Sequence, residues 1–235
     1  MSDAPELTRV PLLSATQAAE VASAVHALRD RWTSRHAECP FFTLGTASYL
    51  DGDQGFQGYR EKAAATNPLL EEHFGDLLAT VAGALAELLG APCRYAPRLA
   101  RPGFHVYLSS PAFRQAGRVH YDLQFEKIDW NGEPVDLEDQ LSFTLPVRLP
   151  RAGAGLLVWK VDYREVRRTF PEVRRRILEE NREPELHPYR VGELVAHPGY
   201  LLHQIAPMPD MEPDDQRITL QGHAARGEDG WILYW

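Results

Sequence analysis

Three side chains of this sequence have the types and spacing of a metal site. His120 and Asp122 lie two residues apart in the segment GRVHYDLQF, and His203 follows in the segment GELVAHPGYLLHQIAP. Residues two apart in a β-strand point to the same face, so a strand here would turn the imidazole and the carboxylate toward one ion. A strand that begins at His203 would supply a second imidazole. Such a set suits Fe(II) and leaves coordination positions open, although Co, Ni and Zn also bind it.

Other histidines compete for this role. His197 is an alternative distal ligand, but it precedes the Pro-Gly turn, and a structural hydrogen bond is the simpler interpretation. His36 and Glu38 also lie two residues apart. They follow a helical pattern and do not lie between candidate strands, so we interpret them as surface residues. The favoured ligands are therefore His120, Asp122 and His203.

A candidate carboxylate anchor lies downstream of the metal ligands. Arg217 begins the alternating segment RITLQGH, in which Arg217, Thr219, Gln221 and His223 share one face. A guanidinium can bind a carboxylate through two parallel hydrogen bonds, and a hydroxyl two residues further on can add a third. This pattern predicts an anchor for a dicarboxylate.

The order of these motifs, HxD followed by a late His and then Arg-x-Thr, resembles the Fe(II)/2-oxoglutarate-dependent dioxygenase superfamily. The resemblance covers about residues 100 to 235, and it is strongest to the prolyl-hydroxylase-like and small-molecule hydroxylase branches. In the former branch the 2-oxoglutarate anchor is often Lys, whereas this chain has Arg217. It implies that iron is bound by His120, Asp122 and His203.

The resemblance also implies a co-substrate site and an activity. Arg217 and Thr219 would hold the distal carboxylate of 2-oxoglutarate, and Tyr107 would donate a further hydrogen bond to it. The enzyme would consume dioxygen, convert 2-oxoglutarate to succinate and hydroxylate a small molecule such as an amino acid, a peptide or a biosynthetic intermediate. Related halogenases replace the carboxylate ligand by a small residue, so Asp122 favours hydroxylation or a kindred oxidation. His105 and Gln124 are expected to line the pocket.

Periodicity predicts the elements that position these residues. Apolar residues at helical spacing predict a helix from Ser14 to Trp32, and a second helix begins at Asn67 and ends before Gly90. From Phe104 onward the apolar period becomes two, which is typical of strands. Such strands are predicted within 104–108, 141–149, 155–161, 189–197, 217–223 and 231–235, with a helical stretch broken at Pro171 between two of them.

These elements predict a mainly β protein with a double-stranded β-helix (jelly-roll, cupin-like) core and flanking N-terminal α-helices. We expect one domain over 1–235, with a mainly helical N-terminal support over 1–100 and the catalytic β-helix over 101–235. Residues 41–59 are expected to form loops and turns. A non-catalytic cupin-like protein that binds or senses a metal or a small ligand is the alternative, but it does not need Arg-x-Thr.

Composition excludes several classes of protein. The net charge of −8 argues against a nucleic-acid binder, which needs a basic face. Two cysteines and the absence of a secretory or membrane-spanning pattern favour the cytoplasm and no membrane partner. The arginines from Arg164 to Arg176 are expected on a solvated helix face. The C-terminal sequence WILYW is expected to be a buried strand, with a homodimer contact as the alternative.

Overall fold

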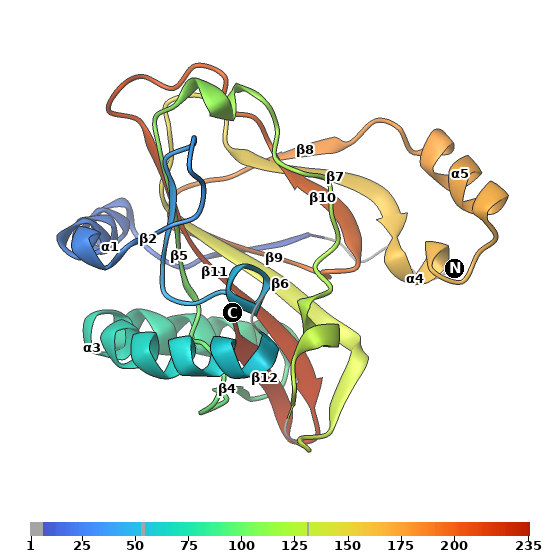
Figure 1. Ribbon diagram of the computed structural model, residues 1–235, viewed down its shortest axis with the longest axis horizontal. Helices are drawn as coiled ribbons and strands as arrows, with labels where there is room; N and C mark the ends of the chain where they lie inside the picture. Colours follow the sequence, from blue (N-terminus) through green and yellow to red (C-terminus); the bar gives the residue numbers. More distant parts are fainter. Residues whose placement is uncertain (1–6, 53–54, 131) are drawn as a thin grey trace.

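The computed structural model describes residues 7–52, 55–130 and 132–235, and its strands form two sheets (Figure 1). The large sheet has the order β1-β9-β6-β11-β5-β3-β2, with β12 beside β11 and β4 beside β12. The small sheet has the order β10-β7-β8. All paired strands are antiparallel except β12 and β4.

The strands are β1 Thr8–Pro11, β2 Thr33–Ser34, β3 Phe41–Leu44, β4 Cys93–Tyr95, β5 Gly103–Leu108, β6 Val135–Arg148, β7 Gly155–Asp162, β8 Glu185–Pro188, β9 Glu193–His197, β10 Leu201–Ile205, β11 Gln216–Gly227 and β12 Gly230–Tyr234. The α-helices are α1 Ala15–Ala27, α2 Ser48–Asp51, α3 Gly55–Leu89, α4 Tyr163–Val166 and α5 Pro171–Glu180. Short 3-10 helices include Pro111–Arg114 and Gln124–Lys127. The six strands predicted from periodicity are thus confirmed within β5, β6, β7, β9, β11 and β12.

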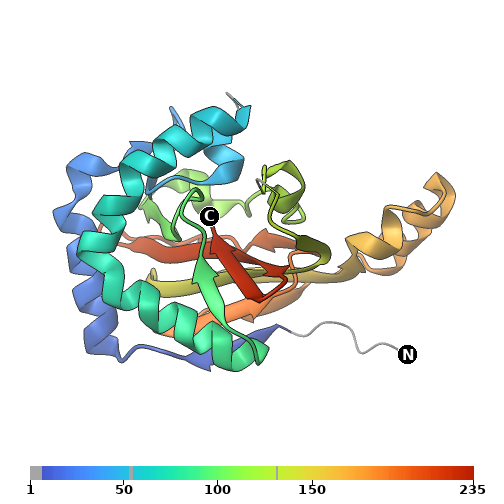
Figure 2. The same ribbon diagram turned by 90° about the horizontal axis from the view of Figure 1, so that it is seen from below.

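The two faces of the large sheet have different neighbours. One face is apolar and packs against α1 and α3, where buried side chains such as Val81, Leu145 and Leu220 form the main core. Figure 2 shows both helices on the same side of the sheet. The other face turns toward the small sheet, and a smaller cluster with Val158, Val195 and Leu201 joins the two sheets. Alternation along each strand therefore sends apolar residues to the helices and leaves the second face for polar ones.

The N-terminal hundred residues combine helices with sheet. The capping box of Ser14 and Gln17 at the start of α1 is confirmed. Strands β1, β3 and β2 extend the large sheet at its two edges. The prediction of loops over 41–59 is wrong in part, because Phe41–Leu44 pairs with β5 and α2 follows it. The many Gly and Asp residues that follow within 45–58 concealed this strand.

The predicted start of the second helix is also wrong. Helix α3 begins at Gly55, and Pro68 lies inside it. Asn67 does not cap the helix: its side chain donates to the carbonyl of Leu99 and accepts from the backbone N–H of Arg101. The helix bends at Phe74, whose backbone is non-helical. Asn67 therefore connects the helix to the segment before β5 through hydrogen bonds.

The sequence had predicted a strand at the HxD segment, and this prediction is wrong. His120 forms an isolated antiparallel bridge with His203, and Asp122 lies in irregular backbone. Gly117, His120 and Asp122 each donate to the 199–205 region, but their partners are spaced unevenly (Ile205, His203 and Gly199). A continuous ladder cannot form with such a register.

The C-terminal strand and the arginine-rich helices have the predicted environments. All five residues of WILYW are buried within this chain, as the strand prediction expected. The segment from Tyr163 to Glu180 forms α4 and α5, with Pro171 in the first turn of α5, and Figure 1 shows it projecting from the two sheets. No helix within the described residues is long and apolar enough to cross a membrane.

Candidate metal and co-substrate site

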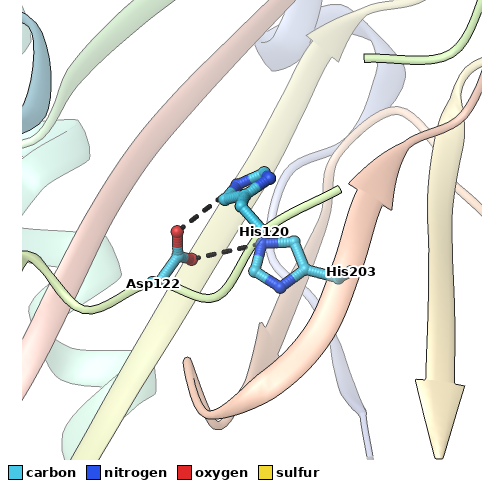
Figure 3. Close-up of side chains that lie close together, drawn as sticks. All are labelled: His120, Asp122 and His203. Atoms are coloured by element: carbon cyan, nitrogen blue, oxygen red, sulfur yellow. Dashed lines mark ion pairs between the residues drawn. The ribbon is translucent and has the colours of Figure 1, made fainter. Parts of the chain in front are cut away.

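The structure brings the three predicted metal ligands together. Ligand atoms of His120, Asp122 and His203 all lie within 4.8 Å of one another. Nε2 of His120 is 3.6 Å from Oδ1 of Asp122, and Nε2 of His203 is 3.4 Å from Oδ2. Figure 3 shows His203 on a strand, with the other two side chains on an irregular segment beside it. The three residues converge although no second strand carries them.

Backbone contacts hold both imidazoles in one orientation. Nδ1 of His120 is 2.8 Å from the carbonyl oxygen of Arg118, and Nδ1 of His203 is 2.8 Å from that of Leu201. A carbonyl only accepts, so Nδ1 of each ring carries the proton and donates it. In the neutral rings, Nε2 is then left with a free lone pair, which is the arrangement found in metal-binding histidines.

The carboxylate is held by its neighbours from several sides. The backbone N–H of Asp122 donates to the carbonyl of Gly199 at 2.8 Å, and Gln124 donates to Oδ1 at 3.1 Å. A Cβ atom at Gly199 would lie 2.4 Å from the side chain of Gln140 and 2.9 Å from Cβ of Asp122. This position therefore needs glycine, because any side chain would displace the carboxylate.

The local charges favour an ionised Asp122. Burial raises its pKa, but His203, His223 and His120 outweigh burial and hold the pKa well below its usual range. Burial lowers the pKa of His203, while the facing Asp122 raises it above the ordinary value. Burial and the neighbouring His203 lower the pKa of His120. Negative charge concentrated between two imidazoles is suited to a divalent cation.

A cavity of about 620 Å³ connects the three residues with Arg217. Arg217 is fully buried, and none of its three guanidinium nitrogens has a hydrogen-bond partner among the residues that the structure describes. A buried charge without a partner is strongly unfavourable. The guanidinium therefore fits an anionic ligand in the cavity, as the sequence predicted.

Two tyrosine rings flank this guanidinium. Its carbon lies 5.1 Å from the ring centre of Tyr107 and 5.7 Å from that of Tyr189. Burial raises the pKa of both phenols, although the Arg217 charge opposes it, so they stay protonated and can donate. Both tyrosines line the cavity. Thr219 is fully buried but is not among the residues that line the cavity, and its hydroxyl accepts from Gln221 at 3.3 Å.

The remaining candidates also have defined places. His105 and Gln124 line the cavity, as expected, and Nε2 of His105 lies 2.7 Å from the Tyr49 hydroxyl. His197 also lines it, 4.8 Å from the ring of His203, but it is not part of the converging set. Burial lowers the pKa of His197 to about 4, so its ring is neutral. His36 and Glu38 are exposed, as predicted.

Sequence reasoning missed several cavity residues, among them Tyr189 and Thr144. Tyr189 lies directly after β8 and reaches Arg217 from a different sheet region, and no local pattern indicates this. Thr144 lines the cavity from β6. Thr144 alternates with the apolar residues of β6 and therefore lies on the polar face of that strand, as Ser142 does. Only the order of the strands shows that β6 is paired with β11 in the sheet.

Comparison with solved structures identifies the fold. SnoN, a non-haem alpha-ketoglutarate-dependent epimerase from nogalamycin biosynthesis, has a TM-score of 0.52 at 16% identity, over 95% of this chain and 81% of that chain. SnoK, a non-haem alpha-ketoglutarate-dependent carbocyclase from the same biosynthesis, has 0.51 at 13%, over 99% and 93%. EctD from S. alaskensis, determined with 2-oxoglutarate and 5-hydroxyectoine, has 0.51 at 14%, over 94% and 72%.

These likenesses confirm the predicted mainly β fold, a jelly-roll core with flanking helices. The chain matches no model of a protein family. No curated protein matches it either.

Proposed function

We propose that this chain is an Fe(II)- and 2-oxoglutarate-dependent oxygenase that oxidises a small molecule. One observation carries the proposal: a single cavity joins a two-histidine, one-carboxylate set to a buried arginine that has no hydrogen-bond partner among the described residues. The fold similarity to enzymes described as alpha-ketoglutarate dependent supports it.

The residues present fit an Fe(II) ion. His120, Asp122 and His203 supply two neutral nitrogen ligands and one anionic oxygen ligand from one side, which leaves the cavity side open. Bound there, iron would supply the activation of dioxygen that this class of oxidation needs. The chain itself fixes the ring orientations and keeps the carboxylate ionised.

The residues around Arg217 fit the carboxylate of 2-oxoglutarate. A bidentate pair would satisfy the guanidinium, and the protonated phenols of Tyr107 and Tyr189 can each donate a further hydrogen bond. A contribution of Thr219 remains a prediction. Because Arg217 is fully buried, solvent screens its charge only weakly. A carboxylate bound to it would replace its hydrogen bonds to water by hydrogen bonds to donors that the protein holds in place.

Anaerobic titration tests the proposal. Adding 2-oxoglutarate to the Fe(II) protein should produce a visible charge-transfer band, and admission of oxygen should then yield succinate. Asp122→Ala should lose both signals, whereas Asp139→Ala, an exposed carboxylate away from the cavity, should keep them. Absence of the band in the wild-type protein would reject the assigned site. A band without any succinate would instead favour the cupin-like binding protein.

A further inference from the structure

Five of the nine histidines line the cavity, and the proposed metal centre uses two of them. Two of the others, His197 and His223, belong to a row that crosses three neighbouring strands. In the register of the large sheet, Ser142 of β6 is paired with His197 of β9 on one side and with His223 of β11 on the other. Cross-strand partners share a face, and all three residues line the cavity.

The hydrogen bonds of this row leave polar atoms for a ligand. Nδ1 of His197 lies 3.0 Å from the carbonyl oxygen of Pro198, so this nitrogen donates and Nε2 of the neutral ring can only accept. Nδ1 of His223 lies 3.1 Å from Oγ of Ser142. A hydroxyl can donate or accept, so Nε2 of His223 can take either role. No hydrogen bond to either Nε2 exists among the residues that the structure describes.

The row begins beside the metal centre and lies away from the co-substrate anchor. The rings of His197 and His203 are 4.8 Å apart. On β11, His223 is six residues from Arg217, which is about 20 Å along a strand. A five-carbon diacid is far shorter than this separation. The row is therefore placed to contact a second ligand rather than the group bound at Arg217.

The wall next to the row is aromatic. The ring centroids of Tyr49 and His223 lie 6.3 Å apart in an edge arrangement, and Tyr49 is 38% exposed. Phe56 also lines the cavity near the start of α3. Exposed aromatic side chains in a cavity favour a flat apolar partner. The cavity thus offers ring contacts on one side and hydroxyl-type hydrogen bonding on the other.

On this basis, and resting on the proposed function, we propose that the row of His197, Ser142 and His223 binds the substrate, and that the substrate is a ring compound carrying a free hydroxyl group. The hydroxyl would donate to Nε2 of His197 or exchange a hydrogen bond with Nε2 of His223. Its ring would lie against Tyr49. The row positions the substrate beside the metal centre and takes no part in holding the ion or the co-substrate.

Paramagnetic relaxation of small probes by Mn(II) tests this proposal without turnover. The probes are two matched pairs, phenol with anisole and benzyl alcohol with its methyl ether, added to the protein with Mn(II) and 2-oxoglutarate, and with Zn(II) in place of Mn(II) as the diamagnetic reference. Methylation removes only the donor, so the hydroxyl probes should be broadened more strongly by about 2- to 10-fold, the range of one net hydrogen bond. His36→Leu, an exposed histidine, should behave as wild type.

The variants separate binding from folding. His197→Leu and His223→Leu should lose the preference for hydroxyl probes when each variant is saturated with Mn(II). Ser142→Ala, which keeps both rings, should reduce this preference by about twofold. Equal broadening within each pair, an unchanged preference in the variants, or no broadening while Mn(II) is bound would overturn the proposal alone. Failure of Mn(II) to bind, measured by its electron paramagnetic resonance signal, would overturn the proposed function with it.

Discussion

The two halves of the candidate site are built in contrasting ways. Arg217 lies on β11, which is hydrogen-bonded to β5 on one side and β6 on the other. His120 and Asp122 lie on the irregular 115–123 segment, which meets β10 and the turn before it through one bridge and a few separate backbone bonds. The strand gives the arginine a position set by the whole sheet. The position of the segment depends on a few local contacts, so ligand binding should stabilise the segment more than it stabilises β11.

The largest expected effect concerns hydrogen exchange in these two regions. Metal binding should slow exchange of the His120 and Asp122 amides by about 100-fold at a hundredfold excess over Kd, because a ligand of the native segment opposes its opening. The Arg217 amide should already exchange slowly and should change little. Exchange measured by NMR with and without Zn(II) checks this. Equal protection of both regions without metal would remove the contrast.

Replacing the buried cation should separate ligand binding from stability. Arg217→Met should weaken 2-oxoglutarate binding by roughly 10- to 100-fold, since a charge-assisted hydrogen bond is lost. The free energy of unfolding should not fall, because the substitution removes a buried charge that has no hydrogen-bond partner among the described residues. Calorimetric titration and thermal unfolding measure the two effects. Arg151→Met, on an exposed arginine, is the control.

Gly199 should be the sensitive point of the irregular half. Gly199→Ala should lower metal affinity by about 10-fold, because the new Cβ atom would push against Gln140 and Asp122, and contacts behind a metal ligand tune its affinity. Gly75→Ala, where no atom lies within 4 Å of the added Cβ, should leave affinity unchanged. Metal titration of both variants measures the difference, and similar affinities would contradict this view of Gly199.

The smallest expected effect distinguishes two hydroxyls near Arg217. Tyr189→Phe should weaken 2-oxoglutarate binding by a few-fold, the cost of one hydrogen bond of about 1 kcal/mol. Thr219→Val should change it less, because Thr219 is not among the residues that line the cavity. The same calorimetric titration compares them. A larger loss of 2-oxoglutarate affinity in Thr219→Val would instead support the role of Thr219 as an anchor, which the sequence predicted.

Sequence reasoning succeeded where one local period decides the outcome. The alternation in RITLQGH placed Arg217 and His223 on one face, and the structure has both lining the cavity. It failed at Asn67, because a residue suited to a helix N-terminus instead bonds to the backbone of Leu99 and Arg101. The partner of a polar side chain is a tertiary property, so propensity alone could not show it.

By itself, the sequence determined the residue types, the alternating and helical periods, and hence the strands, the helices and the candidate ligands. Only the tertiary structure decided that His120 faces His203, that Tyr189 covers Arg217, and that His197, Ser142 and His223 form one row. The physical reason is that side-chain direction follows from local backbone period, whereas these contacts depend on hydrogen bonds between segments far apart in the chain.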